Sequence, residues 1–270
     1  MNMNKALWEK GDFTQVAAMM RESGQQLIDS LAITKGMKIL DLACGDGTTA
    51  LPAAELGADV LGIDIASNLV AAGRIRAQAA GLANLRFEEG DASDLSGVAD
   101  EQFDLVVSVF GAMFAPRPFD VAREMVRVTK PGGRIFMGNW IPGDPTLVAQ
   151  ILKISAAYTP APPEGFISPV TWGLASNVVE RFGAAGIAPD RITFDKATCV
   201  FRHSGPAAEM LEKFRLYYGP TMNAFAAAES NGKADKLRDD LAALFAAQNQ
   251  GGEEQTIVPA TFLRVSISKP

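Results

Sequence analysis

The chain has 270 residues, of which 48% are hydrophobic, and it carries a net charge of -6 at pH 7. It holds a substantial core but no basic stripe for phosphates, so we expect no nucleic-acid or membrane-surface partner. Cys44, Cys199 and the single His203 are too few for a disulfide framework or a multi-histidine metal site, so no metal is expected. Residues 1–8 lack the apolar stretch of a signal peptide, and no 18-residue apolar run occurs, so the cytoplasm is the expected compartment.

Apolar runs alternate with helical stretches over the first half of the chain. A helix is predicted over 13–32, within an N-terminal helical segment, 1–33. The predicted strands that follow are 38–43, 59–63, 85–88, 103–109 and 134–140, and the helices between them are 48–55, 68–80 and 119–129. Strict alternation implies right-handed crossovers and a parallel sheet, here the core 34–140.

The regular alternation of predicted strands and helices ends after residue 140. The predicted elements are a helix over 175–185, a sixth strand over 191–201, helical stretches over about 206–228 and 233–248, and a last strand over 256–267. Residues 141–270 therefore complete the sheet (about 174–203 and 256–268) and add two insertions, about 141–173 and 204–250. Both insertions leave from the carboxyl edge of the sheet, where open α/β folds bind ligands, so they are interpreted as a substrate cap.

The strongest local signal is a glycine-rich turn after the first strand, Ile39-Leu40-Asp41-Leu42-Ala43-Cys44-Gly45-Asp46-Gly47. Its glycines permit a tight strand-to-helix turn and close approach of the backbone to a ligand. Gly45, Gly47 and Ala50 also fit the fingerprint of a dinucleotide-binding protein. Asp64, at the end of the second strand, can accept hydrogen bonds from ribose hydroxyls in either case, so the turn alone leaves both ligands open.

Acidic residues at other strand ends favour S-adenosylmethionine (SAM) over a dinucleotide. Asp41 lies four residues before Gly45, where a carboxylate would repel a pyrophosphate but attract the amino or sulfonium charge of SAM. Asp91 follows the third strand and can accept from an adenine amino group, while the Ala92 N–H can donate to the ring. Asp41 could instead serve only to bond backbone N–H groups of the turn.

Taken together, residues of about 34–140 resemble the class I SAM-dependent methyltransferases, close to the branch of ubiquinone/menaquinone C-methyltransferases. The matching motifs are LDLACGDG, GIDIAS, EEGDAS, FDLVVSVFGAMF and VTKPGGR. The resemblance implies a doubly wound, Rossmann-like α/β fold whose seven-stranded sheet has an antiparallel last strand. It also implies SAM as the cofactor, with Gly45 and Gly47 at the methionine part and Phe110 beside the ligand. The expected cofactor-binding residues are Asp41, Ala43, Gly45, Gly47, Asp64, Ile65, Asp91, Ala92 and Phe110.

Candidates for the acceptor pocket are less distinctive. They follow the fourth strand or lie in the cap, and each could equally be a core residue: Met113, Phe114, Trp140, Trp172, Tyr217 and Tyr218. His203 follows the sixth strand and is a candidate base, although a lone histidine at a strand end is often a surface residue. No catalytic residue is otherwise assigned.

These features predict methyl transfer from SAM to a small-molecule acceptor by a monomer or homodimer. A non-catalytic SAM-binding regulator and a nicotinamide-dependent oxidoreductase are the alternatives. A DNA amino-methyltransferase would carry an Asn/Asp-Pro-Pro-Tyr-type motif after the fourth strand, where this chain has Val109-Phe110-Gly111-Ala112.

Overall fold

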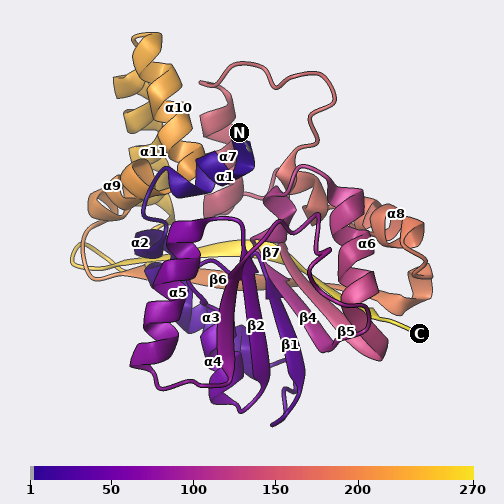
Figure 1. Cartoon of the computed structure of the whole chain (residues 1–270). Coiled ribbons are helices and arrows are strands. Elements are labelled where there is room, and N and C mark those ends of the chain that lie inside the picture. Colours follow the sequence, from indigo (N-terminus) through magenta and orange to yellow (C-terminus); the bar gives the residue numbers. More distant parts are fainter. Residues whose placement is uncertain (1–2) are drawn as a thin grey trace.

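Seven strands form one mixed sheet in the computed structural model, which describes residues 3–270. The strand order is β3-β2-β1-β4-β5-β7-β6 (Figure 1). The strands are β1 (Lys38–Leu42), β2 (Asp59–Asp64), β3 (Leu85–Glu89), β4 (Phe103–Val109), β5 (Thr129–Trp140), β6 (Ile192–His203) and β7 (Thr256–Ser268). β1 to β5 pair in parallel, and β7 runs antiparallel to both β5 and β6. The expected α/β sheet with an antiparallel last strand is therefore confirmed.

Helices cover both faces of the sheet because its central parallel strands β1, β2 and β4 are buried on both sides. The helices are α1 (Met3–Glu9), α2 (Thr14–Ala17), α3 (Arg21–Asp29), α4 (Ala50–Glu55), α5 (Ser67–Ala79), α6 (Pro118–Val128), α7 (Leu147–Ala156), α8 (Ala175–Ala184), α9 (Ala207–Tyr217), α10 (Gly219–Ser230) and α11 (Ala234–Gln248). Helices α3, α4 and α5 share one buried cluster with the sheet, and α6 and α8 belong to the cluster on the other face. Helices α7, α9, α10 and α11 pack on one another above the carboxyl ends of the parallel strands (Figure 1).

Two predicted helices are broken in the structure. The stretch 13–32 forms α2, a short 3-10 turn and α3, with Met20 outside helical geometry at φ -119° and ψ 7°. The stretch 206–228 divides at Tyr218 (φ -96°, ψ 107°) into α9 and α10. The sequence marks the second break, because Pro220 is tolerated in the first turn of a helix and not in its interior.

Residues 129–133, just before the predicted fifth strand, lie inside β5 and form an irregularity. Phe103 of β4 pairs with Thr129, but Leu105 already pairs with Arg134, so the residues between Thr129 and Arg134 bulge out of the ladder. Gly132, with a φ of 73°, makes this bulge possible.

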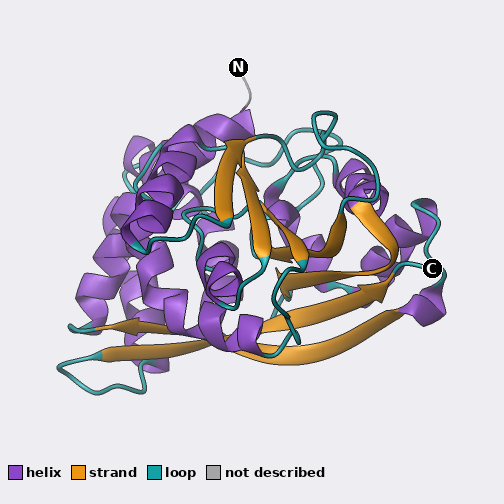
Figure 2. Cartoon of the chain, turned by 60° about the horizontal axis from the view of Figure 1, so that its bottom comes forward, coloured by secondary structure: helices purple, strands orange, loops and turns teal. Residues whose placement is uncertain are grey.

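Strands β6 and β7 extend well beyond the carboxyl edge of the parallel strands. Trp140, the last residue of β5, pairs with Phe262, which pairs in turn with Ala197 of β6. Six further pairs continue from Thr198↔Thr261 to His203↔Thr256. At about 3.3 Å per residue the two-stranded ribbon projects roughly 20 Å past Trp140, and the two long paired strands that run past the others at the bottom of Figure 2 are β6 and β7.

Within the described residues, no helix has the length and apolar character needed to cross a membrane. The same part of the chain contains no group of three or more histidine, cysteine, aspartate or glutamate side chains placed to hold a metal ion.

Candidate functional site

The glycine-rich turn after β1 is built from left-handed backbone. Ala43, Gly45 and Gly47 have φ angles of 56°, 55° and 87°. A Cβ at Gly47 would lie 2.5 Å from Leu51 Cδ1 and 2.7 Å from the Phe87 ring, so this glycine lets the turn pack on the core. A Cβ at Gly45 would meet nothing within 4 Å. Gly45 therefore presents bare backbone to open space, as the close approach of a ligand requires.

Asp41 lies beneath this turn and is 2% exposed. Thr49 Oγ1 donates a hydrogen bond of 2.6 Å to Asp41 Oδ2. Burial, with the nearby charge of Asp64, raises the pKa of the Asp41 carboxyl to about 7. Asp41 thus holds the turn from below, and it does not line the cavity above.

Asp64 ties the end of β2 to the turn. Its Oδ2 accepts from the Gly45 N–H at 2.8 Å, and its Oδ1 accepts from the Ala66 N–H at 2.9 Å. Burial raises the pKa of the Asp64 carboxyl, while the backbone hydrogen bonds oppose that rise. A carboxylate oxygen can accept more than one hydrogen bond, so both oxygens of Asp64 have capacity left for a ligand hydroxyl.

The segment after β3 forms a tight turn. Asp91 Oδ1 accepts from the Ser93 N–H at 2.9 Å and from Ser93 Oγ at 2.6 Å. Arg117 Nη2 lies 3.9 Å from Asp91 Oδ2. Asp91 and Ala92 both face the cavity.

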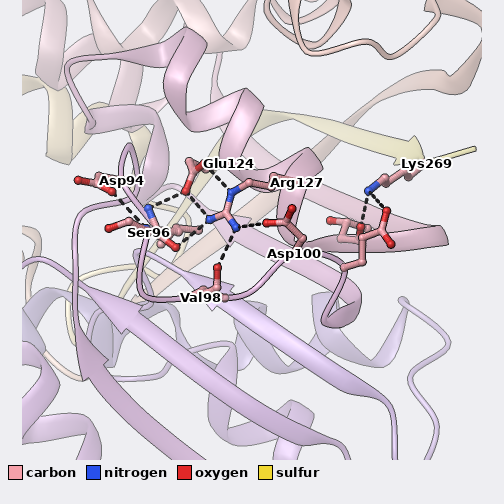
Figure 3. A network of polar contacts seen from close by, with 10 residues as sticks. Asp94, Ser96, Val98, Asp100, Glu124, Arg127 and Lys269 are labelled. Carbon is pink, nitrogen blue, oxygen red and sulfur yellow. Dashed lines mark hydrogen bonds and ion pairs between the residues drawn. The ribbon is translucent and has the colours of Figure 1, made fainter.

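A polar network fixes this segment, which takes the place of a helix between β3 and β4 (Figure 3). Arg127 of α6 donates two hydrogen bonds to Glu124, at 2.8 and 2.7 Å, and one of 2.6 Å to Asp100. It also donates to the Leu95 carbonyl at 2.8 Å, and the Leu95 N–H donates to Glu124 at 2.7 Å. The network therefore anchors the loop that positions Asp91.

The end of β4 meets the glycine-rich turn directly. A Cβ at Gly111 would lie 2.2 Å from the Ala43 carbonyl oxygen, so only glycine permits this approach. Phe110, held in left-handed geometry at φ 61°, stacks on Trp140 with 3.7 Å between ring centroids. Phe262 of β7 meets the Phe110 ring edge-on at 5.0 Å. The three rings form an aromatic wall next to the turn.

The N-terminal helices cover the site, and this covering was not predicted from the sequence. Trp8 packs edge-on against Phe13 (5.4 Å) and Phe114 (5.0 Å). Gly24 of α3 lies so close to Thr48 that a Cβ there would be 2.6 Å from Thr48 Cγ2. The sequence does contain one signal for this role of the N-terminal segment. Trp8 is an aromatic residue at the start of the otherwise polar stretch Trp8-Glu9-Lys10-Gly11-Asp12.

These elements enclose one cavity of about 290 Å³. Seven predicted cofactor residues line it, namely Ala43, Gly45, Asp64, Ile65, Asp91, Ala92 and Phe110. Three predicted acceptor-pocket residues also line it, namely Phe114, Trp140 and Tyr218. Eleven lining residues come from the N-terminal segment, namely Asn4, Trp8, Phe13, Val16, Ala17, Met20, Ser23, Gly24, Gln26, Leu27 and Ser30. The cap insertions contribute only Val148, Phe214 and Tyr218.

The other candidates lie elsewhere. Met113 is buried in the core, and Trp172 packs between the Arg181 guanidinium (4.5 Å) and Phe182. Tyr217 is half-buried outside the cavity lining. His203 lies at the tip of the projecting ribbon, 3.3 Å from Glu209 and also outside the lining. The strand end that carries it is displaced from the site because β6 continues past the sheet edge.

The charges around the turn fit a nucleoside better than a dinucleotide. A pyrophosphate needs free cations or N–H groups, but Arg21 and Arg76 are both engaged by buried Asp46, at 2.8 and 3.2 Å. The acidic groups that remain, Asp64 and Asp91, can accept hydrogen bonds from the hydroxyl and amino groups of a ligand. Open backbone at Gly45 with these two acceptors matches the donor set of SAM.

Comparisons with known proteins agree with this geometry. A family described as "Methyltransferase domain" matches residues 40–137. Uncharacterized protein Rv1403c of Mycobacterium tuberculosis is 32% identical over 226 residues, covering 82% of this chain and 79% of the relative. Demethylmenaquinone methyltransferase of Paenarthrobacter aurescens is 35% identical over 114 residues, 42% of this chain and 43% of that protein.

Solved structures show the same fold at low identity. The YcgJ protein of Bacillus subtilis has a TM-score of 0.60 at 20% identity, covering 92% of this chain and 99% of its own. A phosphoethanolamine N-methyltransferase of Haemonchus contortus, in complex with S-adenosylhomocysteine (SAH), has a TM-score of 0.57 at 16% identity. It covers 92% of this chain and 52% of its own.

Fold, site and comparisons together define a class I SAM-dependent methyltransferase, the class the motifs indicated, with SAM as its cofactor. Within that class the chain belongs to one family with the mycobacterial protein Rv1403c, which it matches over most of its length.

Proposed function

We propose that the protein methylates a small, largely apolar acceptor by in-line displacement. One observation carries the proposal: a single cavity joins the polar groups Asp64 and Asp91 to the aromatic wall of Phe110, Trp140 and Phe262. Enclosed apolar surface beside a few fixed polar groups is typical of a small-molecule site. The acidic net charge gives no support for a nucleic-acid acceptor.

The bound cofactor would supply an electrophilic methyl group on a sulfonium, whose departure leaves a neutral sulfide. The protein then has mainly to align the acceptor and exclude water. Asp64, Asp91 and the Ala92 N–H would hold the nucleoside, and the Gly45 backbone would lie beside the methionine part. Phe110 and Trp140 would orient the acceptor, while Trp8 and Phe13 close the roof against solvent.

The cavity favours an acceptor that needs no strong base. Of the described lining residues, none is a histidine, and Asp46 is engaged by two arginines. Burial raises the pKa of Tyr218, so its hydroxyl stays protonated at neutral pH and can donate but not remove a proton. A nucleophile that is already ionised or unprotonated suits this site.

Calorimetry with SAM, SAH and NAD, followed by a metabolite screen for SAH release, tests the proposal. We expect micromolar binding of SAM and SAH and turnover with one or more apolar acceptors. Binding of NAD alone would support the oxidoreductase alternative. Tight SAM binding without turnover on any acceptor would support a regulator. A cytoplasmic monomer or homodimer is part of the proposal and is checked by fractionation and size-exclusion chromatography.

Asp64→Asn supplies a direct test of the cofactor residues. The amide keeps one acceptor oxygen but loses the charge and one of the bonds to Gly45 or Ala66. We expect SAH binding to weaken by about 1.5–3 kcal/mol, the range for hydrogen bonds to charged groups. Asp59→Asn, an exposed position at the start of β2, is the matched control. Unchanged affinity in folded Asp64→Asn would remove Asp64 from the site.

A further inference from the structure

One cationic side chain lines the cavity, and the proposed function gives it no role. Among the lining residues that the structure describes, Arg264 of β7 is the only lysine, arginine or histidine. It pairs in register with Gly138 of β5, two residues before Trp140, and stands on the same face of β7 as Phe262. The guanidinium therefore lies next to the aromatic wall, on the side of the sheet roofed by α3.

Arg264 has no anionic partner within residues 3–270. Its Nε is buried without a hydrogen-bond partner, and its guanidinium carbon lies 5.4 Å from the centre of the Phe136 ring. Asp195 is its cross-strand neighbour on β6, but it is exposed and forms no ion pair with it. A half-buried guanidinium without an acceptor is costly in the free protein, so a ligand that supplies one gains affinity.

Two polar side chains that line the cavity from the N-terminal segment already donate hydrogen bonds. Gln26 Nε2 donates to Glu22 at 3.2 Å, and Ser30 Oγ donates to the Leu27 carbonyl at 2.6 Å. Arg134, also on this face, donates to the Leu31 carbonyl at 2.8 Å. Arg264 is thus the cationic group of the described cavity lining with free donors, and its planar fork matches a carboxylate.

We propose that Arg264 forms an anion-binding subsite of the cavity, so that the acceptor is an acid with an apolar body. This deepens the proposed function by naming the acceptor class. A carboxylate could come from the acceptor or from the methionine part of SAM. The strand order favours the acceptor: β7 lies three strands from β1, whose end carries Gly45 beside the methionine part, a separation of about 14 Å at 4.8 Å per strand.

A matched pair of fluorescent probes tests the subsite without knowledge of the natural acceptor. 8-Anilino-1-naphthalenesulfonate and N-phenyl-1-naphthylamine share an aromatic body and differ in the sulfonate. Both would be titrated into full-length wild type, Arg264→Met and Arg264→Lys, with and without saturating SAH. Arg86→Met, at an exposed position on β3, is the control, and thermal melting checks that each variant folds.

We expect Arg264→Met to weaken the sulfonate dye at least tenfold and the neutral dye less than twofold. Arg264→Lys should retain most of the sulfonate affinity, and Arg86→Met should change neither dye. An unchanged SAH Kd in Arg264→Met assigns the anion to the acceptor, whereas a tenfold weaker Kd assigns it to the methionine carboxylate. Equal responses of the two dyes with an unchanged SAH Kd overturn the subsite, as does a wild type that binds no sulfonate dye. SAH binding by the wild type reports the proposed function separately.

Discussion

Replacing Asp41 by asparagine should change how stability depends on pH. The carboxyl is buried beneath the glycine-rich turn, where its pKa is about 7 instead of the ordinary 3.8. Between these values the folded state holds a proton that the unfolded state has released. The contribution of Asp41 to stability is therefore fully present below pH 3.8 and is lost as the pH rises towards 7. Each pH unit corresponds to about 1.4 kcal/mol, so at most about 4 kcal/mol is lost.

Asparagine cannot ionise, and its amide oxygen can still accept the hydrogen bond from Thr49. Urea unfolding of the wild type, Asp41→Asn and the exposed control Asp59→Asn at pH 4.5 to 8 measures the effect. We expect the stability of Asp41→Asn relative to the wild type to increase up to about pH 7 and to level off above it, while Asp59→Asn follows the wild type. A difference between Asp41→Asn and the wild type that does not vary with pH would refute the reasoning.

Two other substitutions test the supports of the site. Gly111→Ala places a Cβ against the Ala43 carbonyl, so we expect a lower melting temperature and an SAH Kd raised at least tenfold; wild-type behaviour would show that the two strand ends are free to separate. Arg127→Met removes the anchor of the Asp91 loop, so we expect a loss of about 1–3 kcal/mol in unfolding free energy and several-fold weaker SAH binding by calorimetry. The exposed Arg123→Met is its control, and equal effects of the two would contradict a specific role for the network.

The parts of the site at strand ends could be predicted from the sequence. Apolar runs fix where β1, β2 and β3 stop, and parallel strands bring those ends to one edge. Gly45, Asp64 and Asp91 therefore line one cavity, and their binding of SAM stays a prediction. Their exact hydrogen bonds, such as the one from the Gly45 N–H to Asp64, depend on how the turn folds. The spacing of hydrophobic residues along the chain does not predict them.

The distant parts could not be predicted. Trp8 of the N-terminal helices lines the cavity, whereas Trp172 of the insertion packs against Phe182. Tertiary packing decides between them, and the residue type alone does not indicate the outcome. The position of His203 outside the cavity lining could not be foreseen, because the register of β6 against β7 is set across three intervening helices. Arg264 was missed for a related reason: an arginine in an alternating strand is usually expected to face solvent.

The pairing of β5 with β7 has a consequence for synthesis of the chain. Arg134 of β5 pairs with Ser268, which follows 134 residues later in the sequence. At about 5–20 residues per second, a ribosome needs roughly 7–27 s to cover that interval. Throughout it the nascent protein exposes the β5 edge, with Ile135, Phe136 and Met137, as an unpaired template for aggregation. We therefore expect the yield of folded protein to depend on how fast residues 141–255 are translated and on whether the β5 edge is shielded meanwhile.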